Sequence, residues 1–198
     1  MTRNLLKLTT AILLGMSTLG LMAPSLAQDN EFAEPLTALA QGKLREIAQN
    51  PVLVAAISAQ NQVSAGYDAA KIDELDKQWR AEVDAASKPM IDATLGNEAS
   101  KYLAGVQAES AGLFTEIFAT DAMGLNAAQS TVTSDYWQGD EDKFTLSFGA
   151  GADAVALGEV EQDESTQTFQ SQVSITITDP ATGAPIGSIT AGVDLSML

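Results

Sequence analysis

Residues 169–195 decide the fold, and they read FQSQVSITITDPATGAPIGSITAGVDL. Apolar and polar residues alternate from Phe169 to Thr178, which is the period of a strand with one buried face. Asp179-Pro180-Ala181-Thr182-Gly183 is a strong turn signal, and Ile186 to Leu195 alternates again. The residues predicted to share the apolar faces are Val173, Ile175 and Ile177, then Ile189, Ala191, Val193 and Leu195. The stretch therefore predicts an antiparallel hairpin.

Sequence patterns typical of strands begin earlier in the chain, just after Gly112. Residues 113–119 predict a strand, 120–124 a turn, and 125–133 the returning strand. A short strand is expected over 155–160, before an acidic loop. Residues 112–198 thus form the sheet part of the chain.

The preceding residues, 28–111, have helical periodicity instead. A helix is expected from Leu36. It is expected to restart at Asn50-Pro51, because Asn caps helices and Pro is tolerated at the first helical position. Residues 61–66 are expected to break it. Asp68 is expected to cap the next helix, which Lys88-Pro89 ends, and 97–107 is a further helical segment. On that helix, apolar residues spaced three to four positions apart form a stripe along one side: Ile72, Leu75, Trp79, Val83 and Ala86. We expect one α+β domain, 28–198, with long N-terminal helices packed on a central antiparallel sheet of about five strands.

Residues 1–27 are predicted to be a secretory signal peptide. Arg3 and Lys7 form a basic start, Ala11 to Met22 is apolar, and cleavage is expected near Ala27. The alternative, an uncleaved membrane anchor, is weaker because the apolar stretch has 12 residues where about 20 are needed to span a bilayer. The chain ends at Leu198 without another apolar run of spanning length, so the mature chain is expected to be periplasmic or secreted and not inserted in a membrane.

Charge and composition exclude several functions. The chain has 10 Lys and Arg against 26 Asp and Glu, and cleavage would remove two of the basic residues, which leaves a net charge of −18. Such acidity disfavours binding to nucleic acid or anionic lipid. Because Cys and His are absent, thiol chemistry, a Ser-His-Asp triad and a zinc site with nitrogen or sulfur ligands are excluded.

The order of motifs in the sheet part resembles the Cache superfamily, the PAS-like extracytoplasmic sensor domains also called PDC domains. The residues that carry the resemblance are Asp121-Ala122-Met123-Gly124, Thr133 to Glu141, Gly158-Glu159-Val160 with Asp163-Glu164-Ser165, and Asp179 to Gly187. In that family a D-x-x-G hairpin opens the sheet, and a second Asp- and Gly-containing hairpin closes it. The resemblance implies a small ligand between the sheet and its covering loops, in the class of amino acids, amines and carboxylates. Most members of the family continue into a membrane helix and a signalling module, whereas this sequence stops at the last predicted strand. It is therefore expected to act through a partner, a membrane sensor or transporter.

Asp135, Tyr136 and Trp137 form the densest group of candidate ligand-binding side chains. Aromatic rings can wall a pocket or stack on a cation, and Asp135 can hold an ammonium group. The alternative is that Tyr136 and Trp137 fill the core beneath a loop while Asp135 caps a turn. Asp163 joins the candidates because the resemblance puts it near the family's pocket wall.

Other clusters are given weaker roles. The acidic groups at 140–142 and 161–164 do not match a calcium loop, so no metal site and no cofactor are expected and solvated surface is the favoured interpretation. Arg80, next to Trp79, is expected to be exposed or paired with Asp76 or Asp84 rather than to hold a ligand carboxylate. Gly149-Ala150-Gly151 is expected to be a flexible loop.

The sequence predicts a sensor domain that binds a small molecule, without a catalytic residue. The alternative is a protein–protein interaction module with a collapsed pocket, docking through Ile72, Leu75 and Trp79 if that stripe is exposed. A hydrolase using only Asp and Glu is a third possibility, and it requires two carboxylates facing each other across a cleft.

Overall fold

The computed structural model describes residues 31–162 and 168–198. Its centre is an antiparallel sheet with strand order β2-β1-β6-β5-β3, and β4 pairs with β5 beside this path. The strands are β1 (Phe114–Asp121), β2 (Asn126–Gln129), β3 (Val155–Leu157), β4 (Glu161–Gln162), β5 (Phe169–Thr178) and β6 (Pro185–Asp194). The predicted hairpin at 169–195 is therefore β5 and β6, and the α+β class with helices on an antiparallel sheet is confirmed. The predicted signal peptide, 1–27, and Asp163 lie outside the described residues.

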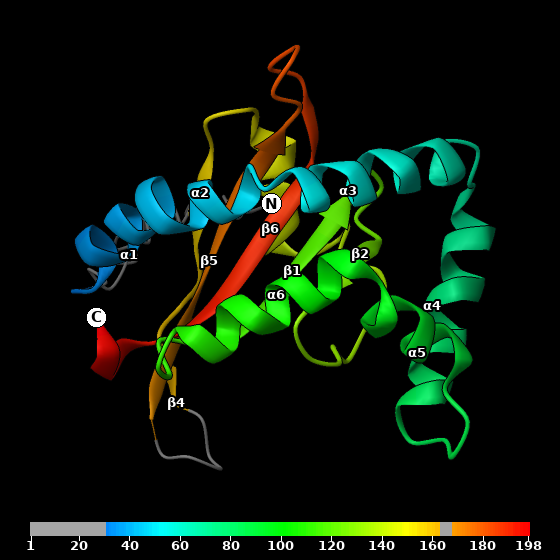
Figure 1. Cartoon of the computed structure of the whole chain (residues 1–198), viewed down its shortest axis with the longest axis horizontal. Helices are drawn as coiled ribbons and strands as arrows, with labels where there is room; N and C mark the ends of the chain where they lie inside the picture. Colours follow the sequence, from blue (N-terminus) through cyan, green and yellow to red (C-terminus); the bar gives the residue numbers. More distant parts are fainter. Residues whose placement is uncertain (1–30, 163–167) are drawn as a thin grey trace, which may run out of the picture.

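A long helical run crosses the sheet from one end to the other (Figure 1). It consists of α1 (Ala33–Leu39), the π-helical turn η1 (Ala40–Leu44), α2 (Arg45–Ala48) and α3 (Pro51–Ser64). The restart at Asn50 is confirmed, because the Asn50 side chain accepts from the Val52 N–H at 3.0 Å and Pro51 takes the first helical position. The predicted break over 61–66 is wrong at its start, since α3 continues to Ser64.

Three further helices follow, α4 (Ala69–Val83), α5 (Pro89–Gly96) and α6 (Glu98–Glu109). Figure 1 shows α6 beside α3 on the same face of the sheet, while α4 and α5 stand beyond the β2 edge. Asp68 caps α4 as expected, accepting from the Lys71 N–H at 2.9 Å. Helix α4 ends at Val83, before Ala86, the last residue of the predicted apolar stripe. Pro89 begins a helix, α5, that was not predicted. The reason is that Glu82 supplies the acceptor that the start of α5 needs, binding the N–H groups of Met90 and Ile91 at 2.7 and 3.1 Å.

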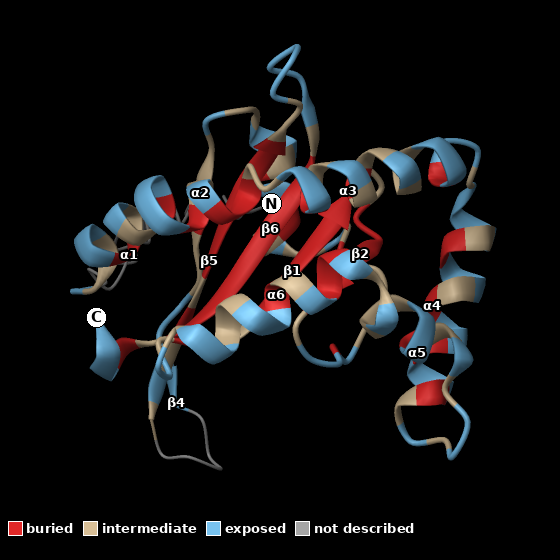
Figure 2. Ribbon diagram, viewed as in Figure 1, coloured by how far each residue is buried: buried red, intermediate tan, exposed pale blue. Residues whose placement is uncertain are grey.

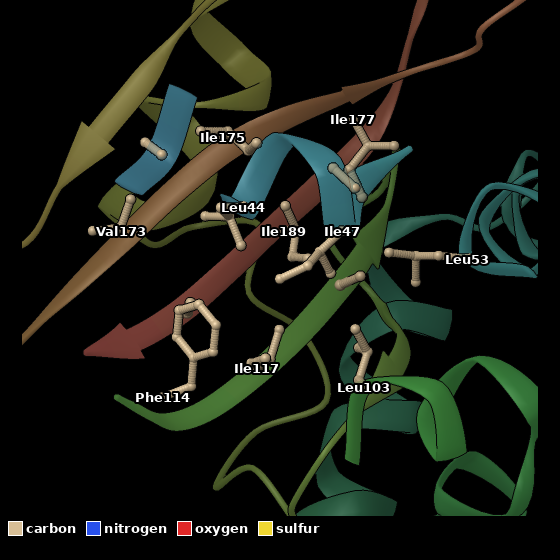
Figure 3. Packing of buried hydrophobic residues seen from close by; sticks show 14 of the residues in the cluster. Leu44, Ile47, Leu53, Leu103, Phe114, Ile117, Val173, Ile175, Ile177 and Ile189 are labelled. Atoms are coloured by element: carbon tan, nitrogen blue, oxygen red, sulfur yellow. The ribbon is translucent and has the colours of Figure 1, made fainter. Parts of the chain in front are cut away.

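The face of the sheet under the helices is mainly aliphatic. Ile175, Ile177 and Ile189 are fully buried there, together with Leu44 and Leu53 from the helices. Figure 3 shows these side chains meeting between the helical run and the strands. In Figure 2 most of β1 and β6 and the middle of β5 are red and the outward surfaces of the helices are largely pale blue, so this layer is the main core.

The two predicted hairpin motifs are built by their Asp and Gly residues. The Asp121 carboxylate accepts from the N–H groups of Met123 and Leu125, both at 2.9 Å, and Gly124 has a φ of +80°. A Cβ at Gly124 would lie 2.6 Å from the Cα of Gly139, so this turn also needs the glycine for space. Asp179 has the same role in the second turn, where it accepts from the N–H groups of residues 181 and 182.

Candidate functional site

The predicted cluster at 135–137 is held by α4. One carboxylate oxygen of Asp76 accepts from the backbone N–H groups of Tyr136 and Trp137, at 3.0 and 3.1 Å. The other binds Arg80 Nε at 2.7 Å, and Arg80 Nη2 lies 2.9 Å from a carboxylate oxygen of Asp135. The hydrogen bond to Asp76 and the charges of both carboxylates raise the pKa of Arg80. We call this group of Asp76, Arg80 and residues 135–137 the α4 latch.

The aromatic rings of the predicted cluster have different surroundings. The Tyr136 ring stacks on Trp79 with centroids 5.3 Å apart, and burial, with the nearby Asp121 carboxylate, raises the pKa of its phenol. Trp137 instead donates from Nε1 to the Met123 carbonyl at 2.8 Å and lies against Gly139, bracing the β1–β2 turn. Tyr136 lines one of the two cavities described below, and Asp135 and Trp137 line neither of these two. Ligand binding by Asp135, Tyr136 and Trp137 stays a prediction.

The expectation for the end of α4 is confirmed in one respect: Arg80 pairs with Asp76. Trp79 is fully buried and donates from Nε1 to the Thr133 carbonyl at 2.9 Å. Ile72 is 8% exposed. Of the three residues proposed as a docking face in the interaction-module alternative, Ile72 and Trp79 are thus buried within the protein, and Leu75 is half-buried.

The face of the sheet opposite the helices is polar, although its central positions are also buried. Thr120 and Ser188 hydroxyls lie 2.8 Å apart, and Ser174 and Thr190 hydroxyls lie 2.9 Å apart. These four residues are at most 2% exposed. Because each hydroxyl has a partner on the neighbouring strand, this polar face can be buried without leaving those groups unsatisfied.

A segment between β2 and β3 covers this face. It contains α7 (Asp142–Thr145) and the short 3₁₀ helix η2 (Phe148–Ala150), so the flexible loop expected at 149–151 is partly helical. The rings of Phe144 and Phe148 stack with centroids 5.1 Å apart, and the Thr176 hydroxyl donates to the Gly151 carbonyl at 2.6 Å. These contacts fix one end of the cover on the sheet.

Between this covering segment and the sheet lies a cavity of about 630 Å³. We call this cavity the acidic hollow. Its floor comes from three adjacent strands, with Glu116 on β1, Gly192 on β6 and Gln172 on β5 in one row. Gly192 has no side chain, so Gln172 Nε2 reaches across it to donate to Glu116 Oε1 at 3.1 Å. Ser174 adds a hydroxyl to the floor.

The walls of the acidic hollow are strongly negative. Together with Glu116, its lining carboxylates are Asp140, Glu141, Asp142, Glu159 and Glu161. The one lining cation, Lys143, lies 2.9 Å from Glu141 and 5.5 Å from the centroid of the Phe118 ring. Its charge is thus already engaged, and the remaining carboxylates give the cavity a negative potential.

Asp140, Asp142 and Glu161 are exposed, as the solvated-surface interpretation predicts, and with Glu141 they also line the acidic hollow. Among the residues that the structure describes, no group of three or more acidic side chains is placed to hold a metal ion. In the same residues, no helix is both long and apolar enough to cross a membrane.

Glu116 and Gln172 were not among the predicted site residues. The alternation of β5 does place Gln172 and Ser174 on its polar face, and this was the available signal. No motif in the residues around Glu116 indicates a site, because its partner, Gln172, is 56 residues away in the chain.

Comparisons with known proteins come from solved structures; no family model and no curated protein matches this chain. The Vibrio cholerae histidine kinase DctB sensor domain matches with 13% identity and a TM-score of 0.37, covering 84% of this chain and 58% of that one. The Pseudomonas aeruginosa amino acid chemoreceptor PctC, solved with GABA, matches with 13% identity and a TM-score of 0.40, covering 81% and 63%. The sensory domain of the Campylobacter jejuni chemoreceptor Tlp3, solved with isoleucine, matches with 14% identity and a TM-score of 0.36, covering 82% and 63%.

The matched proteins are sensor domains. They belong to a histidine kinase and to chemoreceptors. The chain spans about three fifths of the length of these structures.

Proposed function

We propose that this protein is an extracytoplasmic sensor domain that binds a small organic cation, such as an amine, in the acidic hollow. The observation that carries the proposal is a cavity of about 630 Å³ between the sheet and its covering segment, floored by polar side chains and walled by carboxylates. Pockets of about 300–1,000 Å³ are typical for small-molecule ligands. The position agrees with the one that the Cache resemblance implies.

The charges of the lining favour an amine over a carboxylate. A carboxylate ligand needs a cationic partner, and Lys143 is already paired with Glu141. An ammonium group, in contrast, finds Glu116 at the floor, whose Oε2 accepts no hydrogen bond from the described residues. Charge-assisted hydrogen bonds of this kind are about twice as strong as neutral ones.

Binding would act on the covering segment. Residues 140–146 and the sheet both line the acidic hollow, so a ligand that contacts both favours the closed arrangement over open ones. The predicted signal peptide supports a location outside the cytoplasm, and a membrane sensor or transporter is the proposed partner. Binding without catalysis accounts for the site, so no catalytic residue is assigned.

The test is calorimetric titration of the purified protein with putrescine, ethanolamine, alanine and succinate. We expect the two amines to bind, with affinity that falls as salt is raised because the contacts are ionic. Glu116→Gln keeps the shape and removes the charge, and is expected to lower amine affinity about tenfold or more. Glu109→Gln, at the exposed end of α6, is the matched control.

Preferential binding of succinate, or an unchanged putrescine affinity in Glu116→Gln, would contradict the proposal. Failure of all four compounds to bind would also count against it.

A further inference from the structure

A second cavity lies on the other side of the sheet, at the β2 edge, and it shares no lining residue with the acidic hollow. It has a volume of about 400 Å³ and lies between α3, the start of α6 and β2. We call it the tyrosine pocket, after Tyr67 and Tyr136 in its wall.

Most of its wall is apolar. Ala56, Ala59 and Val63 come from α3, and Leu125 and Ala127 from the region of β2. The small alanine side chains on α3 leave the space that a ligand ring requires. Val63 is 64% exposed and forms the outer rim of the pocket.

Three hydroxyl groups of this wall lack partners among the described residues. Ser64 is 1% exposed, and its hydroxyl has no hydrogen bond among the described residues. Leaving a buried hydroxyl unsatisfied is costly, so native proteins rarely do it without a reason. The phenol oxygens of Tyr67 and Tyr136 likewise have no hydrogen-bond partner in the described parts of the chain, and the raised pKa of Tyr136 keeps its phenol a donor.

Charged ligands do not suit this wall. Its one lining carboxylate, Glu98, points to solvent with 80% exposure and pairs with Lys101. Asp121, close behind, is buried and already accepts from Met123, Leu125 and Gln60. A cation would therefore lose its hydration without gaining a free counter-charge, and an anion would meet the Asp121 charge.

We propose that the tyrosine pocket is a second binding site, for a small uncharged ring compound with a hydroxyl group, in the class of phenols and aromatic alcohols. The ring would lie against the α3 alanines and Leu125, and its hydroxyl would bind a tyrosine phenol. This inference does not depend on the acidic hollow.

The test measures binding of benzyl alcohol to the full chain, by ligand-detected NMR and by the fluorescence of Trp79, which stacks on Tyr136. Toluene lacks the hydroxyl, and benzylamine and benzoate add a charge of either sign. We expect benzyl alcohol to bind, toluene to bind about five- to tenfold more weakly, and the charged compounds to bind more weakly still.

Ala59→Phe fills the pocket from an exposed position on α3 and is expected to abolish binding. Ala55→Phe is the matched control, because Ala55 is an exposed alanine on the same helix that does not line the pocket. Tyr67→Phe gives a signature that filling the space lacks: it removes one lining phenol, and should weaken benzyl alcohol binding about five- to tenfold while leaving toluene binding unchanged.

Three results overturn the proposal: no binding of benzyl alcohol, binding that survives Ala59→Phe, or tighter binding of benzylamine than of benzyl alcohol. Glu116→Gln separates the two sites, since it should weaken amines in the acidic hollow and leave benzyl alcohol binding unchanged.

Discussion

The two faces of the sheet are made by the same strands and have opposite chemistry. Towards the helices, β5 and β6 present Val173, Ile175, Ile177 and Ile189, which are fully buried in the core. On the other face, their neighbours in the chain are Gln172, Ser174 and Thr190. Since side chains alternate along a strand, one sequence carries both a stabilising face and a face suited to recognition.

The side chains of the polar face are held in place by hydrogen bonds to one another in the absence of a ligand. The pairs Thr120–Ser188, Ser174–Thr190 and Gln172–Glu116 satisfy one another across strands. A ligand would thus meet a floor that is already ordered, which lowers the entropic cost of binding. The stability of that floor comes from the aliphatic face behind it.

The largest expected effect separates these two roles. Ile189→Ala removes a fully buried side chain from the core and should lower the free energy of unfolding by about 2–5 kcal/mol. Thr190→Ser, one residue along, keeps the hydroxyl that pairs with Ser174 and should cost less than about 1 kcal/mol. Urea unfolding measures both variants. Equal losses would show that the two faces do not divide stability and recognition as proposed.

A second variant tests how the covering segment is fixed. Asp76→Ala leaves the buried N–H groups of Tyr136 and Trp137 without their acceptor, so we expect a loss of about 1–3 kcal/mol. Hydrogen exchange should also quicken at residues 133–138 while β5 and β6 stay protected.

The control for that variant is Asp73→Ala, on the same helix. Asp73 forms an exposed ion pair with Lys77, and such pairs contribute about 0–1 kcal/mol. If both variants lose the same stability, the α4 latch is not what holds the segment.

The smallest expected effect concerns Glu82, which belongs to neither face. Burial alone would raise the pKa of its carboxyl, but hydrogen bonds from Gln78, Ile91 and Met90 outweigh burial and lower it from its ordinary 4.5. The charged form is therefore favoured in the folded state, and the stability it contributes is present above pH 4.5 and lost as the pH falls below it. Glu82→Gln should flatten the acid side of the stability profile measured by thermal unfolding. A profile identical to wild type below pH 4.5 would contradict this role for Glu82.

The fold could be predicted largely because its signals are local. Alternation marked β5 and β6, Asn50 and Asp68 marked helix starts, and Asp with Gly marked both hairpin turns. The start of α5 was missed because Pro89 ends helices as readily as it begins them, and its acceptor, Glu82, belongs to the previous helix.

The candidate site was harder to predict because its contacts are long-range. Asp76 meets Tyr136 across 60 residues, and Gln172 meets Glu116 across 56. Most of the described carboxylates of the acidic clusters are exposed, as the sequence predicted, but their place around a cavity depends on the sheet beneath them. A single sequence without pairing information cannot bring such residues together.

The outer edge of β2 also limits how copies of this protein can associate. The Asn97 side chain donates to the Ala127 carbonyl and the Ser100 hydroxyl accepts from the Gln129 N–H, both at 3.0 Å, while the backbone carbonyl of Tyr136 accepts from the Asn126 N–H at 2.9 Å. These groups would otherwise be free to template a strand from another chain. Side chains and a crossing loop thus occupy the positions that sheet extension would use, and this edge is protected against intermolecular strand addition and the aggregation that follows from it.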